Sequence, residues 1–324
     1  MMALRKPDPT ASKDDGAGGA REAGDAFQPG TAAEAVRRVL IVANPTSGGF
    51  RAARLDAICD RLGRSGHSVS LHLTRRAGEI GEIAANPGLT VGVLAVAGGD
   101  GSVNEAITGF QSNRTPPDLA VIPSGTANVL AAELGLPRKP EAIAGMIARR
   151  RTAPLHYGLA NGRPFVLMAS AGVDAEVVHA VPLALKRRFG KLAYAMVGIE
   201  VALSRKGEDL TVIADGETIR CRLAVATKSR CYGGPFVICR AASVTEPGLH
   251  LVTLERDTAL SALRYVVALA LGRLDRARGV RVLKAEHITI SADRRVPAQV
   301  DGDPFGVTPL TIEPAAVPVR IIIP

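Results

Sequence analysis

Three short segments of small polar residues contain the groups that could do chemistry. They are residues 44–49 (NPTSGG), 98–102 (GGDGS) and 123–128 (PSGTAN). Glycine lets a backbone approach a ligand closely, and the free amides at the start of a following helix favour anions. We therefore expect these segments to form a crevice that binds phosphate groups, which favours a nucleotide as the ligand.

The acidic residue Asp100 stands among the glycines of the second segment. A carboxylate in a phosphate site is repelled by the phosphates unless Mg²⁺ or a lysine offsets its charge. Asp is also common in tight turns, so a turn-forming role is the alternative interpretation. No GKS or GKT sequence occurs, and Asn104 stands where a GxGxxG motif needs its third glycine. The pattern therefore excludes a P-loop and a Rossmann dinucleotide loop.

Each segment follows a short apolar run and precedes a helix-like stretch. The expected strands are residues 39–43, 91–97 and 119–122, and the expected helices are residues 51–62, 103–110 and 129–134. Residues 69–73 alternate as a further strand, with Thr74 at its end. Apolar strands that alternate with helices predict a parallel sheet covered on both faces. Loops at the carboxyl ends of such strands gather at one edge, which would bring the three segments together.

After about residue 155 the apolar runs follow one another more closely. They are residues 165–169, 211–214, 220–227, 236–240, 249–254 and 288–291, with one helical interval at 183–203. Together with the hairpin signal Asp215-Gly216, they predict an antiparallel sheet or sandwich. The run 317–323 is a candidate strand that returns to the first domain.

The chain is therefore expected to be an α/β protein of two domains. Residues 38–155 would form an N-terminal parallel-sheet nucleotide-binding domain, and residues 156–324 a C-terminal, mainly antiparallel β domain. Residues 1–37 are rich in Gly, Ala, Asp and Lys and contain one aromatic residue, Phe27. They cannot bury enough apolar surface to offset the entropy of ordering, so we expect a disordered tail.

Composition limits the class of protein. Of the 324 residues, 47% are hydrophobic and 22% are charged, which is typical of a globular chain. The net charge of +9 calls for an anionic partner, whereas 3% aromatic residues without Trp argue against stacking on single-stranded nucleic acid. No apolar run reaches the ~18 residues that span a bilayer, and the four cysteines show no CxxC spacing. We expect a reduced, cytoplasmic location.

Seven motifs in this order resemble the catalytic domain of the diacylglycerol kinases and their relatives, the sphingosine and ceramide kinases. They are NPTSG at 44–48, AGGDGSVNE at 97–105, PSGTAN at 123–128, AGVDAEV at 171–177, FGKLAY at 189–194, YGGPF at 232–236 and DGDPF at 301–305. The resemblance covers nearly everything from Val39 to the end. It implies a two-domain lipid kinase with ATP in the crevice between an ATP-binding domain, 38–155, and a lipid-substrate domain, 156–324.

The resemblance also implies the residues of the site. Those that bind ATP would be Asn44, Pro45, Thr46, Ser47, Gly48, Thr74, Gly98, Gly99, Asp100, Gly101, Ser102, Val103, Asn104, Glu105, Ser124, Gly125, Thr126 and Asn128. One of Asp301 and Asp303 would take the proton from the lipid hydroxyl as it attacks the γ-phosphate. Without the resemblance, the Asp-Gly-Asp sequence is just as easily a hairpin turn.

Three positions depart from the family pattern. Val129, His156 and Pro247 stand where relatives often carry an Asp, and the third of these carboxylates is linked in relatives to a structural metal. Mg²⁺ prefers oxygen ligands, so we expect no structural Mg²⁺ and assign no metal ligand. Mg²⁺ that arrives with ATP is unaffected. These losses leave open a different lipid substrate or a subgroup without activity.

Two segments bear on membrane contact. The basic residues 186–188 would meet phosphate or anionic headgroups, or else form a solvated helix face. Residues 258–274 are strongly apolar apart from Arg264 and Arg273. We expect this helix to pack in the core, and a helix that lies at a membrane is the alternative.

The resulting prediction is an ATP-dependent kinase that phosphorylates a hydroxyl of a membrane lipid, most simply diacylglycerol. It would work in the cytoplasm, peripherally at the inner membrane face. Its partners would be ATP, the lipid and an anionic membrane, with no nucleic acid, and a homodimer stays open. A ceramide or sphingoid-base kinase, an NAD kinase and an inactive lipid- or nucleotide-binding relative are the alternatives.

Overall fold

The computed structural model describes residues 37–172, 208–232, 234, 236–255 and 258–324. All but the last residue of the expected N-terminal tail lies outside these ranges. The helix expected at 183–203, the basic residues 186–188 and the FGKLAY motif also lie outside the described residues.

Six strands form the first sheet, in the order β2-β1-β3-β4-β20-β5. Their bounds are β1 Arg38–Ala43, β2 Ser68–Leu73, β3 Val93–Gly98, β4 Asp118–Pro123, β5 Thr152–Leu155 and β20 Val319–Ile322. The first four strands and β20 run parallel, whereas β5 is antiparallel to β20. The predicted parallel sheet is confirmed, and the last strand of the chain lies within it.

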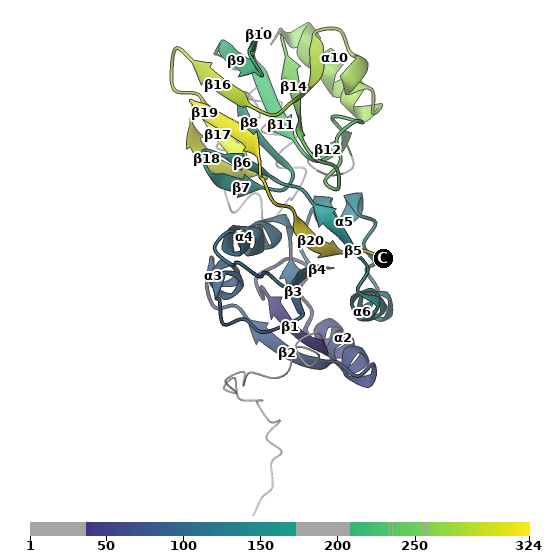
Figure 1. Ribbon diagram of the computed structural model, residues 1–324. Helices are drawn as coiled ribbons and strands as arrows, with labels where there is room; N and C mark the ends of the chain where they lie inside the picture. The colour runs from purple at the N-terminus through teal and green to yellow at the C-terminus, as the bar shows by residue number, and fades with distance from the viewer. Residues whose placement is uncertain (1–36, 173–207, 233, 235, 256–257) are drawn as a thin grey trace, which may run out of the picture.

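Helices cover both faces of this sheet (Figure 1). Their bounds are α2 Ala52–Arg64, α3 Glu79–Ala85, α4 Asp100–Phe110, α5 Val129–Glu133 and α6 Pro140–Arg149. Helices α2 and α6 pack together on one face, and α3 and α4 pack together on the other. In α2 the buried residues are Leu55, Ile58 and Leu62, spaced as one helical face requires. Apolar residues on both faces of the sheet are therefore removed from water, which explains the nearly continuous apolar strands.

Two antiparallel sheets form the second half of the chain, in the orders β10-β9-β16-β19-β6-β7 and β15-β14-β11-β8-β17-β18. The first contains β6 Gly158–Ala160, β7 Arg163–Phe165, β9 Leu210–Ala214, β10 Glu217–Cys221, β16 Ile288–Ala292 and β19 Leu310–Pro314. The second contains β8 Met168–Gly172, β11 Leu223–Thr227, β14 Leu249–Leu254, β15 Val280–Ala285, β17 Pro297–Val300 and β18 Asp303–Val307. Buried residues of both sheets, such as Val212, Ile290 and Leu251, share one core, so the predicted antiparallel sandwich is confirmed.

The strand boundaries differ from the sequence prediction in one instructive place. The apolar run 220–227 divides at Arg222, so that β10 ends in one sheet and β11 begins in the other. Hydropathy along the chain does not reveal such a change of sheet, because the apolar residues Cys221 and Leu223 continue on both sides of Arg222. The Asp215-Gly216 hairpin between β9 and β10 forms as expected, with φ of 46° and 89° at its two central residues.

The apolar segment expected to be a core helix is the largest departure. It forms α10, Ala259–Ala270, followed by a short 3₁₀ turn, Leu274–Arg276. Only part of α10 is buried: Ser261 and Tyr265 face inward, whereas Leu260, Leu263, Val266, Val267 and Leu271 are exposed. The expectation of core packing is therefore wrong for this helix, because its apolar residues run around more of its circumference than the sandwich covers.

Candidate functional site

The three polar segments meet at the carboxyl edge of the first sheet, as their positions after β1, β3 and β4 require. Backbone hydrogen bonds join them directly. The N–H of Gly49 donates to the carbonyl of Ser124 at 2.8 Å, and the N–H of Gly125 donates to the carbonyl of Gly98 at 3.2 Å. The loops therefore form one continuous surface, which the sequence predicted.

Glycine is required where the third loop touches the second loop and the first loop. A Cβ on Gly125 would lie 2.5 Å from the Cα of Gly99, and a Cβ on Gly49 would lie 2.8 Å from the carbonyl oxygen of Ser124. Neither distance is compatible with a side chain, so the close approach of the loops depends on these glycines.

A cavity of about 130 Å³ opens beside the first loop. Its lining residues are Asn44, Thr46, Thr74, Arg75, Arg76, Ala77, Ile80 and Glu105. Four of these, Asn44, Thr46, Thr74 and Glu105, are sequence-predicted site residues that the fold brings together. The Asn44 side chain accepts hydrogen bonds from the backbone N–H and the hydroxyl of Thr46, at 2.9 and 2.8 Å, which fixes the loop at the rim.

Two arginines at this cavity were missed in the sequence. Arg75 and Arg76 follow Thr74 directly at the carboxyl end of β2, in the same sheet as the three loops. That position was the available signal, because strand ends at this edge of a parallel sheet face ligands. The Arg76 guanidinium pairs with Glu82, which offsets part of the positive charge that the two arginines bring to this side of the crevice.

Asp100 is the first residue of α4, and its carboxylate faces the start of α5. Its carboxylate oxygens accept hydrogen bonds from the backbone N–H groups of Val129 and Leu130, each at 3.0 Å. The negative charge thus lies at the start of α5, where free amides accommodate it. Asn128 supports the same turn, since its side chain bonds both the N–H and the carbonyl of Gly125. Asp100 holds the second loop to the third.

The remaining residues of the second motif point in several directions. Ser102 is buried against Gly98, where a Cβ would lie 2.3 Å from the serine hydroxyl oxygen, and Val103 lies in the hydrophobic core. The Glu105 carboxylate accepts a hydrogen bond from the N–H of Gly78 at 3.1 Å, and burial raises its pKa. Ser102 and Val103 thus pack beneath the loop, whereas Glu105 lines the cavity beside it.

Asn104 instead reaches the sandwich. Its amide nitrogen donates to the carbonyl of Pro164 at 2.9 Å and to the carboxylate of Asp301 at 2.7 Å. Asp301 also accepts hydrogen bonds from the backbone N–H groups of three consecutive residues, Val166, Leu167 and Met168, at 2.8 to 2.9 Å. Burial raises the pKa of Asp301, while these donors act in the opposite direction.

Asp303, two residues further on, has a different environment. It begins β18, and its carboxylate oxygen lies 3.9 Å from the position that a Cβ on Gly101 would occupy. Gly101 is exposed in the second loop. The Asp-Gly-Asp turn therefore places one carboxylate within a network of N–H donors and the other beside the proposed phosphate loop.

The position of the family's structural metal does not fit a metal in this chain. The buried ammonium of Lys228 donates to the backbone carbonyls of Glu246 and Gly248, at 2.5 and 2.6 Å, on either side of Pro247. These oxygens already face a positive charge, which would repel a divalent cation. Burial lowers the pKa of Lys228 to about 8, and Glu133 and Glu246 act in the opposite direction.

His156 lies close to the same ammonium. Burial lowers its pKa, and the positive charge of Lys228 adds to that effect. Within the described ranges, no group of three or more His, Cys, Asp or Glu side chains is arranged to hold a metal ion. Two of the three departures noted in the sequence, His156 and Pro247, thus lie around a buried lysine.

Two family models match the chain on either side of the junction between sheet and sandwich. The diacylglycerol kinase catalytic domain matches residues 38–160, and the YegS C-terminal NAD kinase beta sandwich-like domain matches residues 168–323. The resemblance to the diacylglycerol kinases, a family of lipid kinases, that was expected from the motifs is confirmed.

Individual members of the diacylglycerol kinase family match over most of their length. A diacylglycerol kinase of Bacillus subtilis (strain 168) is 27% identical over 284 residues, which are 85% of this chain and 92% of the relative. One of Staphylococcus saprophyticus is 28% identical over 278 residues, 84% of this chain and 91% of the relative. The crystal structure of a candidate diacylglycerol kinase from Bacillus anthracis str. Sterne has a TM-score of 0.75 at 21% identity and covers 89% of this chain and 98% of its own. It has the same fold.

Proposed function

We propose that this chain is an ATP-dependent lipid kinase that transfers the γ-phosphate of ATP to a hydroxyl of a membrane lipid, most simply diacylglycerol. The observation that carries the proposal is the convergence of four motifs, since the three loops are hydrogen-bonded at one edge and the Asp-Gly-Asp turn adjoins them. The similarity to diacylglycerol kinases supports the same activity. Mg²⁺ enters as part of the MgATP substrate.

In this proposal the loops bind the phosphates of ATP. The backbone at Gly48 and Gly99 would approach the phosphate oxygens closely, because glycine has no side chain to hold them away. Arg75 and Arg76, at the cavity of the first loop, would offset the phosphate charge. Phosphoryl transfer relies mainly on positioning and on charge neutralisation, which these groups supply.

We assign the proton transfer to Asp303 and a positioning role to Asp301. Asp301 has four N–H donors on its carboxylate, so its lone pairs are committed to holding the turn. Asp303 lies beside Gly101 of the loop that would hold the γ-phosphate. It would accept the proton of the lipid hydroxyl as the oxygen attacks phosphorus.

The test is transfer of labelled γ-phosphate from ATP to diacylglycerol, ceramide, sphingosine and monoacylglycerol in mixed micelles with Mg²⁺. Label in diacylglycerol alone supports the proposal as stated, and label in ceramide or sphingosine reassigns the substrate within the same chemistry. No label in any lipid, with ATP still bound, would favour an untested substrate or an inactive relative, which the altered positions Val129, His156 and Pro247 motivate.

Such an enzyme would work in the cytoplasm and reach its substrate at the membrane surface. Among the residues that the structure describes, no helix combines the length and apolar character needed to cross a bilayer. The net charge of +9 would favour contact with anionic lipids. Cell fractionation with and without a high-salt wash would test this location.

A further inference from the structure

Helix α10 presents a row of exposed aliphatic side chains at the far end of the sandwich from the phosphate loops (Figure 1). We define the α10 face as Leu260, Leu263, Val266, Val267 and Leu271. Its three leucines are unusually exposed, with 75%, 62% and 67% of the surface of Leu260, Leu263 and Leu271 accessible. Exposed apolar surface that is contiguous rather than scattered marks an interaction site.

The α10 face belongs to a helix that is already anchored on its other side. Thr258 caps α10, where its hydroxyl accepts a hydrogen bond from the N–H of Ser261. The Tyr265 hydroxyl donates to the carbonyl of Gly279 at 3.1 Å, and Tyr265 is buried. The helix is therefore held to the sandwich without any contribution from its exposed leucines, which leaves them for a partner.

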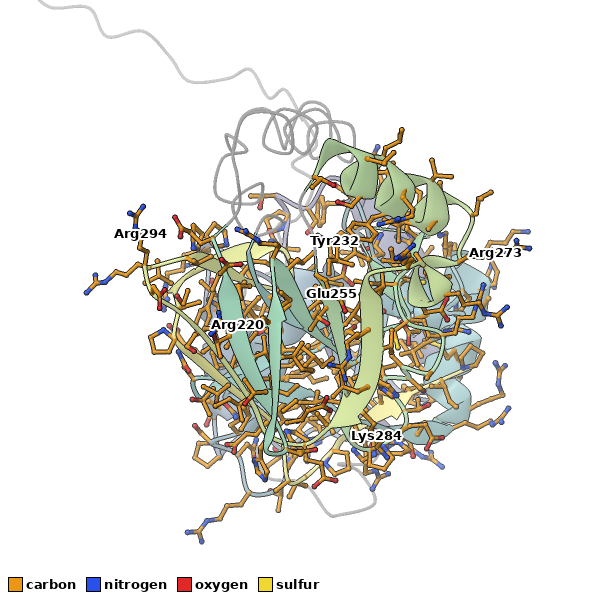
Figure 2. The ribbon with its side chains drawn as sticks, turned by 90° about the horizontal axis from the view of Figure 1, so that it is seen from above. Arg220, Tyr232, Glu255, Arg273, Lys284 and Arg294 are labelled. Carbon is orange, nitrogen blue, oxygen red and sulfur yellow. The ribbon has the colours of Figure 1, made fainter. Side chains whose placement is uncertain are left out.

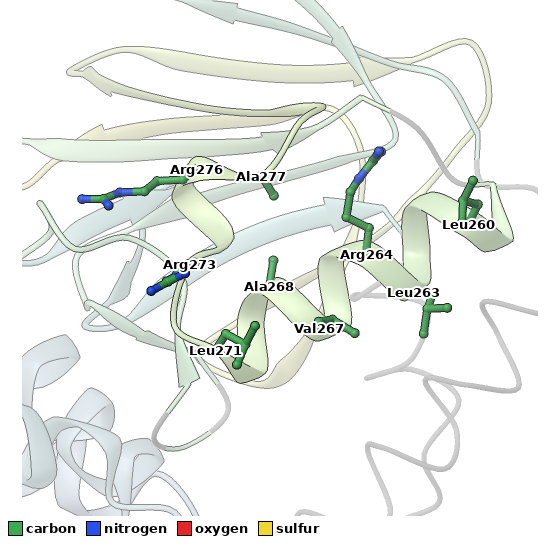
Figure 3. A pocket seen from close by; sticks show the side chains of 9 residues that line it. All are labelled: Leu260, Leu263, Arg264, Val267, Ala268, Leu271, Arg273, Arg276 and Ala277. Atoms are coloured by element: carbon green, nitrogen blue, oxygen red, sulfur yellow. The ribbon is translucent and has the colours of Figure 1, made fainter.

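Arginines border this apolar surface. A hollow of about 450 Å³ beside α10 is lined by Leu260, Leu263, Val267, Leu271 and two alanines, together with Arg264, Arg273 and Arg276 (Figure 3). Arg273 projects outward from the molecule (Figure 2). Asp275, the acidic residue between Arg273 and Arg276, is paired with Arg240 at 3.4 Å. The border of the hollow is therefore positively charged.

We propose that the α10 face docks on an anionic lipid bilayer. Aliphatic side chains would enter the boundary between headgroups and acyl chains, and the arginines would meet the headgroup phosphates. A 12-residue helix is about 18 Å long, too short to cross a hydrocarbon layer of roughly 30 Å, so α10 would lie in the plane of the surface. This proposal rests on the proposed function, whose substrate lies in a bilayer.

Charge favours a bilayer over a second copy of the chain. Self-association through a two-fold axis places each patch against itself, which would bring the bordering arginines of both copies together. A surface of phosphatidylglycerol instead supplies the opposite charge. An aliphatic row without acidic residues is also the pattern of helices that lie at a membrane interface.

The test is sedimentation of the full chain with vesicles of phosphatidylcholine alone or mixed equally with phosphatidylglycerol. We expect L260Q/L263Q/L271Q to weaken binding to mixed vesicles by at least about tenfold, because three exposed apolar side chains are lost. R273Q/R276Q should weaken it by about tenfold and leave binding to phosphatidylcholine unchanged. The controls V317Q, at an exposed valine, and R64Q/R114Q, at exposed arginines of the parallel-sheet part, should bind as the unchanged protein does.

Two outcomes would overturn the docking proposal. One is unchanged vesicle binding by L260Q/L263Q/L271Q with an unchanged thermal unfolding midpoint. The other is a dimer of the original protein in sedimentation equilibrium that the same substitutions convert to a monomer, which would assign the α10 face to self-association.

Activity separates the failure of this proposal from failure of the proposed function. On a short-chain diacylglycerol dispersed as monomers, the docking variants should keep the turnover of the original protein, and they should lose turnover on vesicles. If the original protein phosphorylates no lipid in either form, the proposed function fails, while the vesicle binding still decides the docking.

Discussion

The side-chain amide of Asn104 donates a hydrogen bond to the carboxylate of Asp301 at 2.7 Å, although the two residues are 197 positions apart in the chain. Asn104 belongs to the helix that continues the Gly-Gly-Asp-Gly loop, and Asp301 begins the Asp-Gly-Asp turn of the sandwich. This bond therefore fixes the distance between the proposed phosphate loop and the proposed base. A kinase of this design depends on that distance, because positioning supplies most of the rate of phosphoryl transfer.

Replacement of Asn104 by Ala should weaken both stability and turnover. The loss of the hydrogen bonds to the Asp301 carboxylate and to the Pro164 carbonyl should lower the free energy of unfolding by about 1.5–3 kcal/mol. The two halves would then be less well aligned, so kcat should fall by about tenfold or more, with a smaller change in the KM for ATP. The control is Asn113→Ala, which removes a buried bond to the Ala84 carbonyl within the parallel-sheet part alone. Equal kcat losses in both variants would contradict a specific alignment role.

The two carboxylates of the turn should respond differently to conversion to amides. Asp303→Asn should lower kcat at least about 100-fold, because the proposed proton acceptor is lost. Asp301→Asn should lower the midpoint clearly, because an amide group cannot accept from four N–H donors. Steady-state kinetics and thermal melts of both variants measure this. Full activity in Asp303→Asn would reverse the assignment.

Asp100→Ala should disconnect the second loop from the third. Two backbone N–H groups at the start of α5 would lose their acceptors, which should cost about 1–2 kcal/mol of stability. The altered loop should also raise the KM for ATP and lower turnover. Asp100→Asn keeps one acceptor oxygen, so its stability and its KM for ATP should lie between those of the original protein and those of Asp100→Ala. Asp60→Ala, on the exposed side of α2, should change neither the stability nor the KM for ATP. A loss of turnover with no loss of stability would instead indicate that Asp100 acts on the substrate.

The local part of the site could be predicted from the sequence, and the long-range part could not. Glycine-rich loops after apolar strands have only one edge of a parallel sheet on which to meet, so the convergence around Gly99 and Gly125 followed from strand order. The pairing of Asn104 with Asp301 left no such trace, because it depends on how the sandwich packs against α4. Lys228 was also invisible, since a lysine that follows an apolar strand carries no sign that backbone carbonyls will surround it.

Gly125→Ala tests the contact between the second and third loops. The added Cβ would lie 2.5 Å from the Cα of Gly99 and 2.9 Å from the side-chain oxygen of Asn128, so the loops must separate. We expect a loss of about 1–3 kcal/mol in the free energy of unfolding and a higher KM for ATP. Gly63→Ala, in α2 with nothing within 4 Å of the added carbon, should leave ATP binding unchanged and stabilise the protein by up to about 1 kcal/mol. Unfolding in urea and ATP titration calorimetry give both quantities.

The buried Lys228 should make stability rise with pH in alkaline solution. Its pKa is about 8 in the folded chain, whereas an ordinary lysine has a pKa of 10.5, so the unfolded chain binds this proton more tightly. Folding therefore carries the full cost of the buried charge below pH 8, and this cost disappears as the pH rises toward 10.5. The free energy of unfolding, relative to that of Lys228→Met, should increase by up to about 3 kcal/mol over this range.

The comparison with Lys228→Met cancels the titration of groups that do not interact with Lys228, because those groups titrate alike in both proteins. At neutral pH Lys228→Met should still be less stable than the original protein, because the carbonyls of Glu246 and Gly248 lose their donor. The cost should be about 1–3 kcal/mol for each buried acceptor.

In the absence of ATP, millimolar Mg²⁺ should not raise the unfolding midpoint of the original protein above its value in EDTA. A clear rise would mean that a divalent cation does bind beside Pro247, and that the ammonium of Lys228 gives way to it.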